Sequence, residues 1–175
     1  MHGVRVRWAP LGRGDRRRAA NALVRDMTGA ALRHGPCVHC GGAHGVPRLD
    51  GGVDAVSLAY TASHVFAAVG AGVHALGIDA ECGDPADAAG VERLRAGATL
   101  RDWTRLEAVA KADGRGLALD VATVRIESDA GARWTARVPG APHPFSGADL
   151  IGPAGVVLSV ARAAAPAGQA DPATR

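Results

Sequence analysis

GIDAE, at residues 77–81, is the stretch on which the predicted fold depends, because it follows an apolar run that favours a β-strand. Side chains alternate between the two faces of a strand, so Asp79 and Glu81 point the same way. Ile78 and Ala80 then face the opposite way, toward a core. The sequence therefore predicts two neighbouring carboxylates at the end of a buried strand.

A second stretch, WTRLEAVAK at residues 103–111, has the pattern of an amphipathic helix. Thr99, with Asp102 three residues later, is typical of a helix start. Glu107 and Lys111 are four residues apart and share one stripe of this helix. The neighbouring apolar stripe is formed by Leu100, Trp103, Leu106 and Ala110.

Three carboxylates and one ammonium group would meet if this helix packs beside the strand. Asp79, Glu81 and Glu107 would suit Mg²⁺, which takes few carboxylates and completes its shell with phosphate oxygens and water. Lys111 is the only lysine in a chain whose other Lys/Arg residues are all arginines, which suggests that a compact ammonium group is needed there. The alternative for each segment alone is an ordinary Glu–Lys pair on a solvated helix face.

GIDAE followed by WxxxEAxxK resembles the signature of the 4'-phosphopantetheinyl transferase superfamily. That signature is GxDxE, then a Trp, four residues to a Glu and four more to a Lys. The resemblance implies an α+β fold of two similar lobes, each a small antiparallel sheet with a packed helix. The lobes would span residues 1–80 and 81–162, and the Ala/Pro-rich residues 163–175 are predicted to be a disordered tail.

A basic helix near the N-terminus resembles the family's segment that contacts the phosphates of coenzyme A. Asp15 fits a helix cap, and an apolar stripe predicts a helix that runs to about Arg33. Its first turn carries Arg16 and Arg17, which the resemblance assigns to coenzyme A binding.

Two later segments also resemble coenzyme A contacts of the family. HGVPRL, residues 44–49, resembles a G-[KR]-P segment, with Val46 at the basic position and an arginine two residues further on. A predicted strand at residues 55–60 leads into a Ser-His pair, whose hydroxyl and imidazole are suitable donors to phosphate oxygen. The residues assigned in this way to coenzyme A are Gly45, Pro47, Arg48, Ser63 and His64.

The resemblance implies transfer of 4'-phosphopantetheine from coenzyme A to a serine of an apo acyl or peptidyl carrier protein, with release of adenosine 3',5'-bisphosphate. Asp79, Glu81 and Glu107 would hold Mg²⁺. Glu107 would accept the serine proton, directly or through a metal-bound water, and Lys111 would place its charge at the phosphate.

Two alternatives remain open at this stage. A catalytically silent homologue that binds coenzyme A or a carrier protein would fit Val46 and the short interval before Trp103. A small zinc-binding adaptor would use Cys37 and Cys40 together with nearby histidines, although no second cysteine pair is present. Those histidines are His34, His39 and His44; without zinc, this loop would be a glycine-rich turn with reduced thiols.

Composition sets the broad class. The chain has 175 residues, 47% of them hydrophobic, and a formal net charge of +3. No apolar run approaches the roughly 20 residues that a membrane span needs, and the N-terminus does not resemble a signal peptide. Arginine abundance follows the overall Ala/Gly/Arg bias of the chain, so it is no sign of nucleic-acid binding. We expect a cytoplasmic monomer without nucleic-acid or membrane partners.

Overall fold

The computed structural model describes residues 3–12, 14–37, 40–52, 54–73, 75–83, 91–92 and 97–163. The predicted tail therefore lies outside the described residues, except Ala163 at the end of β10. The helices are α1 (Arg16–Thr28), α3 (Leu100–Asp113) and the short 3₁₀ helices η1 (Gly116–Ala118) and η2 (Val121–Thr123). The strands are β1 (Val4–Pro10), β2 (Leu32–His34), β3 (Pro47–Leu49), β4 (Ala55–Tyr60), β5 (His64–Gly70), β6 (Leu76–Glu81), β7 (Arg125–Ala130), β8 (Arg133–Arg137), β9 (Phe145–Leu150) and β10 (Val157–Ala163).

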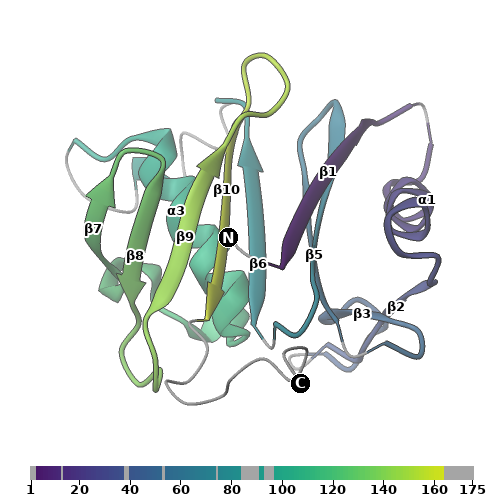
Figure 1. Ribbon diagram of the computed structural model, residues 1–175, viewed down its shortest axis with the longest axis horizontal. Coiled ribbons are helices and arrows are strands. Elements are labelled where there is room, and N and C mark those ends of the chain that lie inside the picture. The colour runs from purple at the N-terminus through teal and green to yellow at the C-terminus, as the bar shows by residue number, and fades with distance from the viewer. Residues whose placement is uncertain are drawn as a thin grey trace, which may run out of the picture.

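The strands form antiparallel sheets, which confirms the predicted α+β class. One three-stranded sheet has the order β1-β5-β4, a five-stranded sheet has the order β6-β10-β9-β8-β7, and β2 pairs with β3. Figure 1 shows the two larger sheets side by side, with α3 behind the five-stranded sheet and α1 beyond the three-stranded sheet. The order of the layers is therefore helix, sheet, sheet, helix.

Alternating side chains on β5 and β6 account for this layering. Val65, Ala67 and Val69 of β5 pack in the cluster that contains α1. Phe66 and Ala68 face the other way, into a middle core that also holds residues of the five-stranded sheet, among them Ile78, Ala80, Leu158 and Val160. The prediction that Ile78 and Ala80 face the core is confirmed.

Helix α1 ends earlier than the sequence predicts. Asp15 accepts a hydrogen bond from the backbone of Arg17, which confirms the predicted cap. Gly29 has a φ of 76° and donates its N–H to Arg25, which closes the helix at Thr28 instead of near Arg33. The chain then turns and enters β2, so the apolar residues beyond Gly29 belong to a strand.

Helix α3 begins as predicted, with Thr99 and Asp102 in a reciprocal capping box. One other feature differs from the sequence prediction, because the strand at Phe145–Leu150 was not predicted. Residues 80 and 81, where the sequence predicts the division between lobes, both lie in β6. Because β6 pairs with β10, it belongs to the sheet of the C-terminal half.

Within the described residues, no helix is long and apolar enough to span a bilayer.

Candidate active site between strand β6 and helix α3

Gly77 allows α3 to lie almost directly on β6. A Cβ atom at Gly77 would come within 2.0 Å of the Ala108 carbonyl oxygen and 2.6 Å of the Ala112 nitrogen, so only glycine fits. Gly77, Asp79 and Glu81 occupy the same face of β6 because side chains two residues apart share a face. The close approach at Gly77 therefore brings the acidic residues of the strand next to the helix.

Asp79 and Lys111 form the central contact of this site. The ammonium group of Lys111 donates to Asp79 Oδ1 at 2.6 Å and to the carbonyl oxygen of Ile78 at 3.2 Å. The Asp79 side chain is 7% exposed and that of Lys111 is 35% exposed. Lysine thus anchors the middle of the strand to the last turn of the helix, with its charge still partly open to solvent.

Glu107 lies in the electrostatic field of this ion pair. Burial raises the pKa of Glu107, the negative charge of Asp79 raises it further, and the ammonium of Lys111 lowers it. A further positive charge beside Glu107 would therefore stabilise its ionised carboxylate. The other carboxylate oxygen of Asp79, Oδ2, is buried and lacks a hydrogen-bond partner among the described residues.

Trp103 fixes the third carboxylate. Its indole Nε1 donates to Glu81 Oε1 at 3.0 Å, which ties the C-terminal end of β6 to the first half of α3. The sequence pattern placed Trp103 in the apolar stripe, but the half-buried ring also serves as a hydrogen-bond donor to Glu81.

These residues fit a divalent cation by the chemistry of their donors. Asp79, Glu81 and Glu107 supply carboxylate oxygens, which are the ligands that Mg²⁺ prefers. The partnerless Oδ2 of Asp79 and the raised pKa of Glu107 both describe groups that a positive charge would stabilise. The structure brings Lys111 against Asp79 and Trp103 against Glu81, with Glu107 in the electrostatic field of Asp79 and Lys111. Among the described residues, the carboxylate oxygens of Asp79, Glu81 and Glu107 are not all within 4.8 Å of one another, so the three carboxylates do not form a closed set of metal ligands here.

A buried ion network beside this site was missed by sequence reasoning. Arg105, 2% exposed, donates to Asp149 at 3.1 Å and 2.7 Å. Trp134 and Ser159 donate to the same carboxylate at 3.1 Å and 2.9 Å. Ser159 is also the cross-strand partner of Asp79, so the network continues the polar row of the site into the sheet. The helical spacing of apolar residues in α3 gives no signal for an arginine on the buried face.

The residues assigned to coenzyme A phosphates gather in part near the turn between β4 and β5. The Ser63 hydroxyl and His64 Nδ1 are 2.8 Å apart, within hydrogen-bond distance. Tyr60, at the end of β4, has its pKa raised by burial and lowered by the charges of Arg16 and Arg17. The first turn of α1 therefore lies within electrostatic reach of this end of β4.

The other three assigned residues lie elsewhere on the N-terminal half. Gly45 precedes β3, while Pro47 and Arg48 are part of it, and β3 leads toward the start of β4. The Ser-His pair instead follows the end of β4. Figure 1 shows β2 and β3 at the lower end of the molecule, where β5 continues into β6. The structure does not bring this hairpin next to Ser63 and His64.

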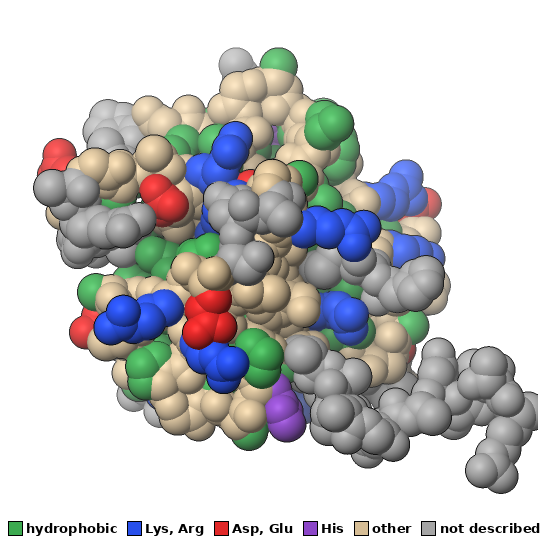
Figure 2. Space-filling view, turned by 60° about the vertical axis from the view of Figure 1, so that its left-hand side comes forward, with side chains coloured by type: hydrophobic (Ala, Val, Ile, Leu, Met, Phe, Trp, Pro, Cys, Tyr) green, Lys and Arg blue, Asp and Glu red, His purple; other side chains and the backbone are tan. Residues whose placement is uncertain are grey.

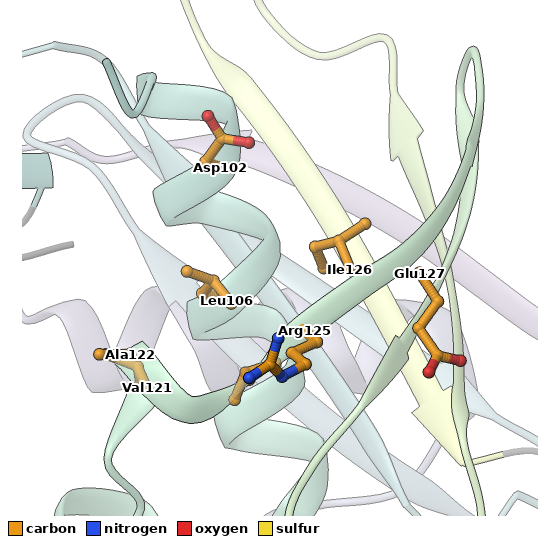
Figure 3. A pocket seen from close by; sticks show the side chains of 8 residues that line it. Asp102, Leu106, Val121, Ala122, Arg125, Ile126 and Glu127 are labelled. Atoms are coloured by element: carbon orange, nitrogen blue, oxygen red, sulfur yellow. The ribbon is translucent and has the colours of Figure 1, made fainter. Parts of the chain in front are cut away.

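A pocket of about 460 Å³ lies on the other flank of α3. Figure 3 shows Asp102 and Leu106 of α3 facing residues of η2 and β7 across it. Leu106 and Glu107 are neighbours, but one residue of a helix turns the side chain by about 100°. The pocket and the carboxylates are therefore separate features, and the pocket has only Asp102, Arg125 and Glu127 as charged lining residues.

The cysteine-containing loop also brings its side chains together. Cys37, Cys40 and His44 form one group at the tip of the β2–β3 hairpin. His34 instead points Nδ1 at the carbonyl oxygen of Gly45, 3.2 Å away, and His39 lies outside the described residues.

Searches against protein-family models and against curated proteins found no match to this chain. The geometry of the site must therefore carry the functional interpretation.

Proposed function

We propose that this protein transfers 4'-phosphopantetheine from coenzyme A to a serine hydroxyl of an apo acyl or peptidyl carrier protein. The proposal includes a two-lobed fold of the phosphopantetheinyl transferase type, in which α1 with the three-stranded sheet and α3 with the five-stranded sheet are the related halves. The observation that supports the proposal is the contact of Asp79 with Lys111 between β6 and α3, with Glu107 in the electrostatic field of this pair and Glu81 tied to α3 through Trp103.

Asp79, Glu81 and Glu107 would hold Mg²⁺, and their supports come from both elements. Lys111 orients Asp79, and Trp103 orients Glu81. When bound, the cation supplies charge neutralisation at the pyrophosphate of coenzyme A.

In the transfer, the serine oxygen bonds to the phosphorus next to the pantetheine, and the pyrophosphate bond to adenosine 3',5'-bisphosphate breaks. Glu107 accepts the proton that the serine loses, directly or through a metal-bound water. The ammonium of Lys111, still partly exposed, stabilises negative charge on the phosphate at the same point.

Coenzyme A would use the basic and hydroxyl groups of the N-terminal half. Arg16 and Arg17 are exposed at the start of α1, and a helix N-terminus favours phosphate. Ser63 and His64 offer a coupled hydroxyl and imidazole near the same end of β4. Gly45, Pro47 and Arg48 would contact the ligand from the β2–β3 hairpin.

Charge makes only a modest contribution to recognition of an acidic carrier protein. Figure 2 shows Lys and Arg side chains spread over one face among acidic ones, instead of gathered in a single basic patch. With a formal charge of +3, attraction would mainly raise the encounter rate and would weaken with salt.

Incubation of the protein with coenzyme A, Mg²⁺ and an apo carrier domain tests the proposal. We expect the mass of the carrier to increase by the phosphopantetheine arm. Glu107→Gln should reduce the transfer rate by about 10²-fold or more, because it removes a metal ligand and the proton acceptor together. Glu127→Gln is the matched control. Glu127 belongs to β7 and lines the pocket on the other flank of α3, so transfer should be unchanged.

Absence of transfer with several apo carriers, or full transfer by Glu107→Gln, would contradict the proposal. Calorimetric titration with coenzyme A then separates the alternatives. Binding without transfer identifies a non-catalytic coenzyme A-binding protein, and no binding removes this ligand altogether.

A further inference from the structure

The tip of the β2–β3 hairpin carries a second cluster of metal-binding side chains. Thiol sulfur atoms of Cys37 and Cys40 and a ring nitrogen of His44 all lie within 4.8 Å of one another. Cys37 is half-buried, and the other two side chains are exposed to solvent. We propose that these three residues bind a zinc ion, independently of the carboxylate site.

The donor spacing agrees with tetrahedral zinc. Cys40 Sγ and His44 Nε2 are 3.4 Å apart. Tetrahedral zinc with a Zn–S bond of about 2.3 Å and a Zn–N bond of about 2.1 Å separates sulfur and nitrogen by roughly 3.6 Å. Thiolate and imidazole are also the ligands that zinc prefers, and three of them leave a fourth position for water or another donor.

The hairpin backbone shapes this cluster. Cys37 N–H donates to the Gly42 carbonyl oxygen, and Gly41 N–H donates to the Cys37 carbonyl oxygen, both at 2.8 Å. Gly45 N–H donates to the carbonyl oxygen of Gly35 at 2.9 Å, so the pairing of β2 with β3 continues toward the cysteine turn. Gly41 has a φ of 72°, which a residue with a side chain adopts only with strain. The backbone thus holds the donors in a preformed turn.

Gly42 lies directly against two of the proposed ligands. A Cβ atom there would be 3.0 Å from ring atoms of His44 and 3.4 Å from Cys40 Sγ. A side chain at residue 42 would therefore push the imidazole away from the thiolate. The glycine pair after Cys40 is explained by the turn at one position and by room for the ligands at the other.

Zinc would also fix the connection between β2 and β3. Its ligand His44 is followed directly by Gly45, which lies just before β3. A Cβ atom at Gly45 would come within 2.3 Å of the Pro36 carbonyl oxygen, so the two hairpin arms are already closely packed there. Any contact of this hairpin with coenzyme A rests on the proposed function, whereas zinc binding does not.

Cobalt titration of the reduced, metal-free full chain tests the site. We expect one equivalent of Co²⁺ to produce thiolate-to-metal charge-transfer absorption, and Zn²⁺ to remove it by displacement. Cys40→Ser should lose this absorption, while Cys82→Ser, which removes a thiol outside the cluster, should retain it. Carboxylates give no such absorption, so binding between β6 and α3 does not interfere with the result.

A pair of glycine variants tests the geometry. Gly42→Ala should weaken zinc affinity on the order of tenfold, as expected when the surroundings of a ligand are disturbed. Gly35→Ala is the matched control in the same hairpin, because its Cβ would make only an ordinary contact of 3.7 Å with Val46.

Three results would overturn the zinc site: no charge-transfer absorption in the parent protein, equal absorption in Cys40→Ser, or equal zinc affinity in the two glycine variants. A Cys37–Cys40 disulfide that persists under reducing conditions would also overturn it. Each of these results leaves phosphopantetheine transfer untouched, because the transfer assay depends on other residues.

Discussion

The two helix-on-sheet faces of this molecule have the same architecture but different chemistry. Under α1, the buried side chains are apolar: Ala20, Leu23, Val24 and Met27 of the helix meet Val56, Val65, Ala67 and Val69 of the sheet. Under α3, the interface also contains Asp79, Arg105, Asp149 and Ser159, all hydrogen-bonded. Burial of charged groups has a large desolvation cost, and apolar side chains of similar volume would stabilise the packing of α3 at least as well.

The two helices also differ in how closely each backbone approaches the strand beneath it. On the α1 face the strand presents Ala67 between two valines, whereas on the α3 face Gly77 brings the helix backbone against the strand. One face is built to pack, and the other is built to hold charged groups at short distances. Buried charged and polar contacts are therefore concentrated on the α3 face.

The largest effect should come from Arg105→Met. This change removes the closest partner of Asp149, which is 16% exposed and keeps Trp134 and Ser159 as donors. The loss should lie near the lower end of the range for a broken buried ion pair, about 3 kcal/mol. Leu23→Met on the α1 face is the control, and a swap of similar volume should cost less than about 1.5 kcal/mol. Denaturant titration measures both, and equal losses would mean that the two faces do not differ in this respect.

Gly77→Ala should have the next largest effect. The added Cβ meets helix backbone that cannot rotate away, and overpacking of this kind costs roughly 1–3 kcal/mol. Transfer activity should fall as well, because α3 carries Glu107 and Lys111. Gly14→Ala, with no atom within 4 Å of the new Cβ, is the control. An unchanged melting temperature and rate in Gly77→Ala would contradict the close approach of α3 to β6.

Trp103→Phe should have a smaller effect, confined to the metal site. A smaller aromatic ring replaces the indole, and the hydrogen bond to Glu81 is lost. A hydrogen bond to a charged group is worth about 1.5 kcal/mol, or roughly tenfold in binding. As a positioning residue, Trp103 should shift the Mg²⁺ concentration needed for half-maximal transfer and leave the rate at saturating Mg²⁺ nearly unchanged. A lowered saturating rate with unchanged Mg²⁺ dependence would contradict that role.

The smallest effect concerns stability and pH in chelator-treated protein. The raised pKa of Glu107 means that the folded state holds its proton where the unfolded state has lost it. Stability from this group is therefore fully present below the unfolded pKa and is lost as pH rises through the folded pKa. Glu107→Gln should remove this loss and be more stable than the parent at pH 7, as measured by urea unfolding.

A parallel pH decline in the parent and in Glu107→Gln would mean that Glu107 is not under electrostatic strain. Addition of Mg²⁺ provides the complement: it should raise the melting temperature of the parent and leave that of the variant nearly unchanged.

Local signals in the sequence were enough to predict the parts of the site that lie on regular elements. Strand alternation placed Asp79 and Glu81 on one face, and the Thr99 cap fixed the start of α3. Helical spacing then put Glu107 and Lys111 on one stripe. These rules are local, so they hold before the tertiary structure is known.

Features that depend on long-range pairing could not be predicted in this way. Arg105 is buried because Asp149, on another element, neutralises it, and no pattern within α3 reveals that partner. The role of Gly77 depends on the position of α3, and β9 contains too much Gly, Asp and Ser to look like a strand. The end of α1 at Gly29 was a local signal, but the apolar residues after it masked the stop.

The most direct test of the central claim is calorimetric titration of Mg²⁺ into the protein saturated with coenzyme A. The carboxylate site predicts one bound ion for the parent chain and no measurable binding for Asp79→Asn or Glu107→Gln, with all three proteins folded by circular dichroism. Equal Mg²⁺ binding in the three proteins, or none in the parent, would show that Asp79, Glu81 and Glu107 do not form a common metal site.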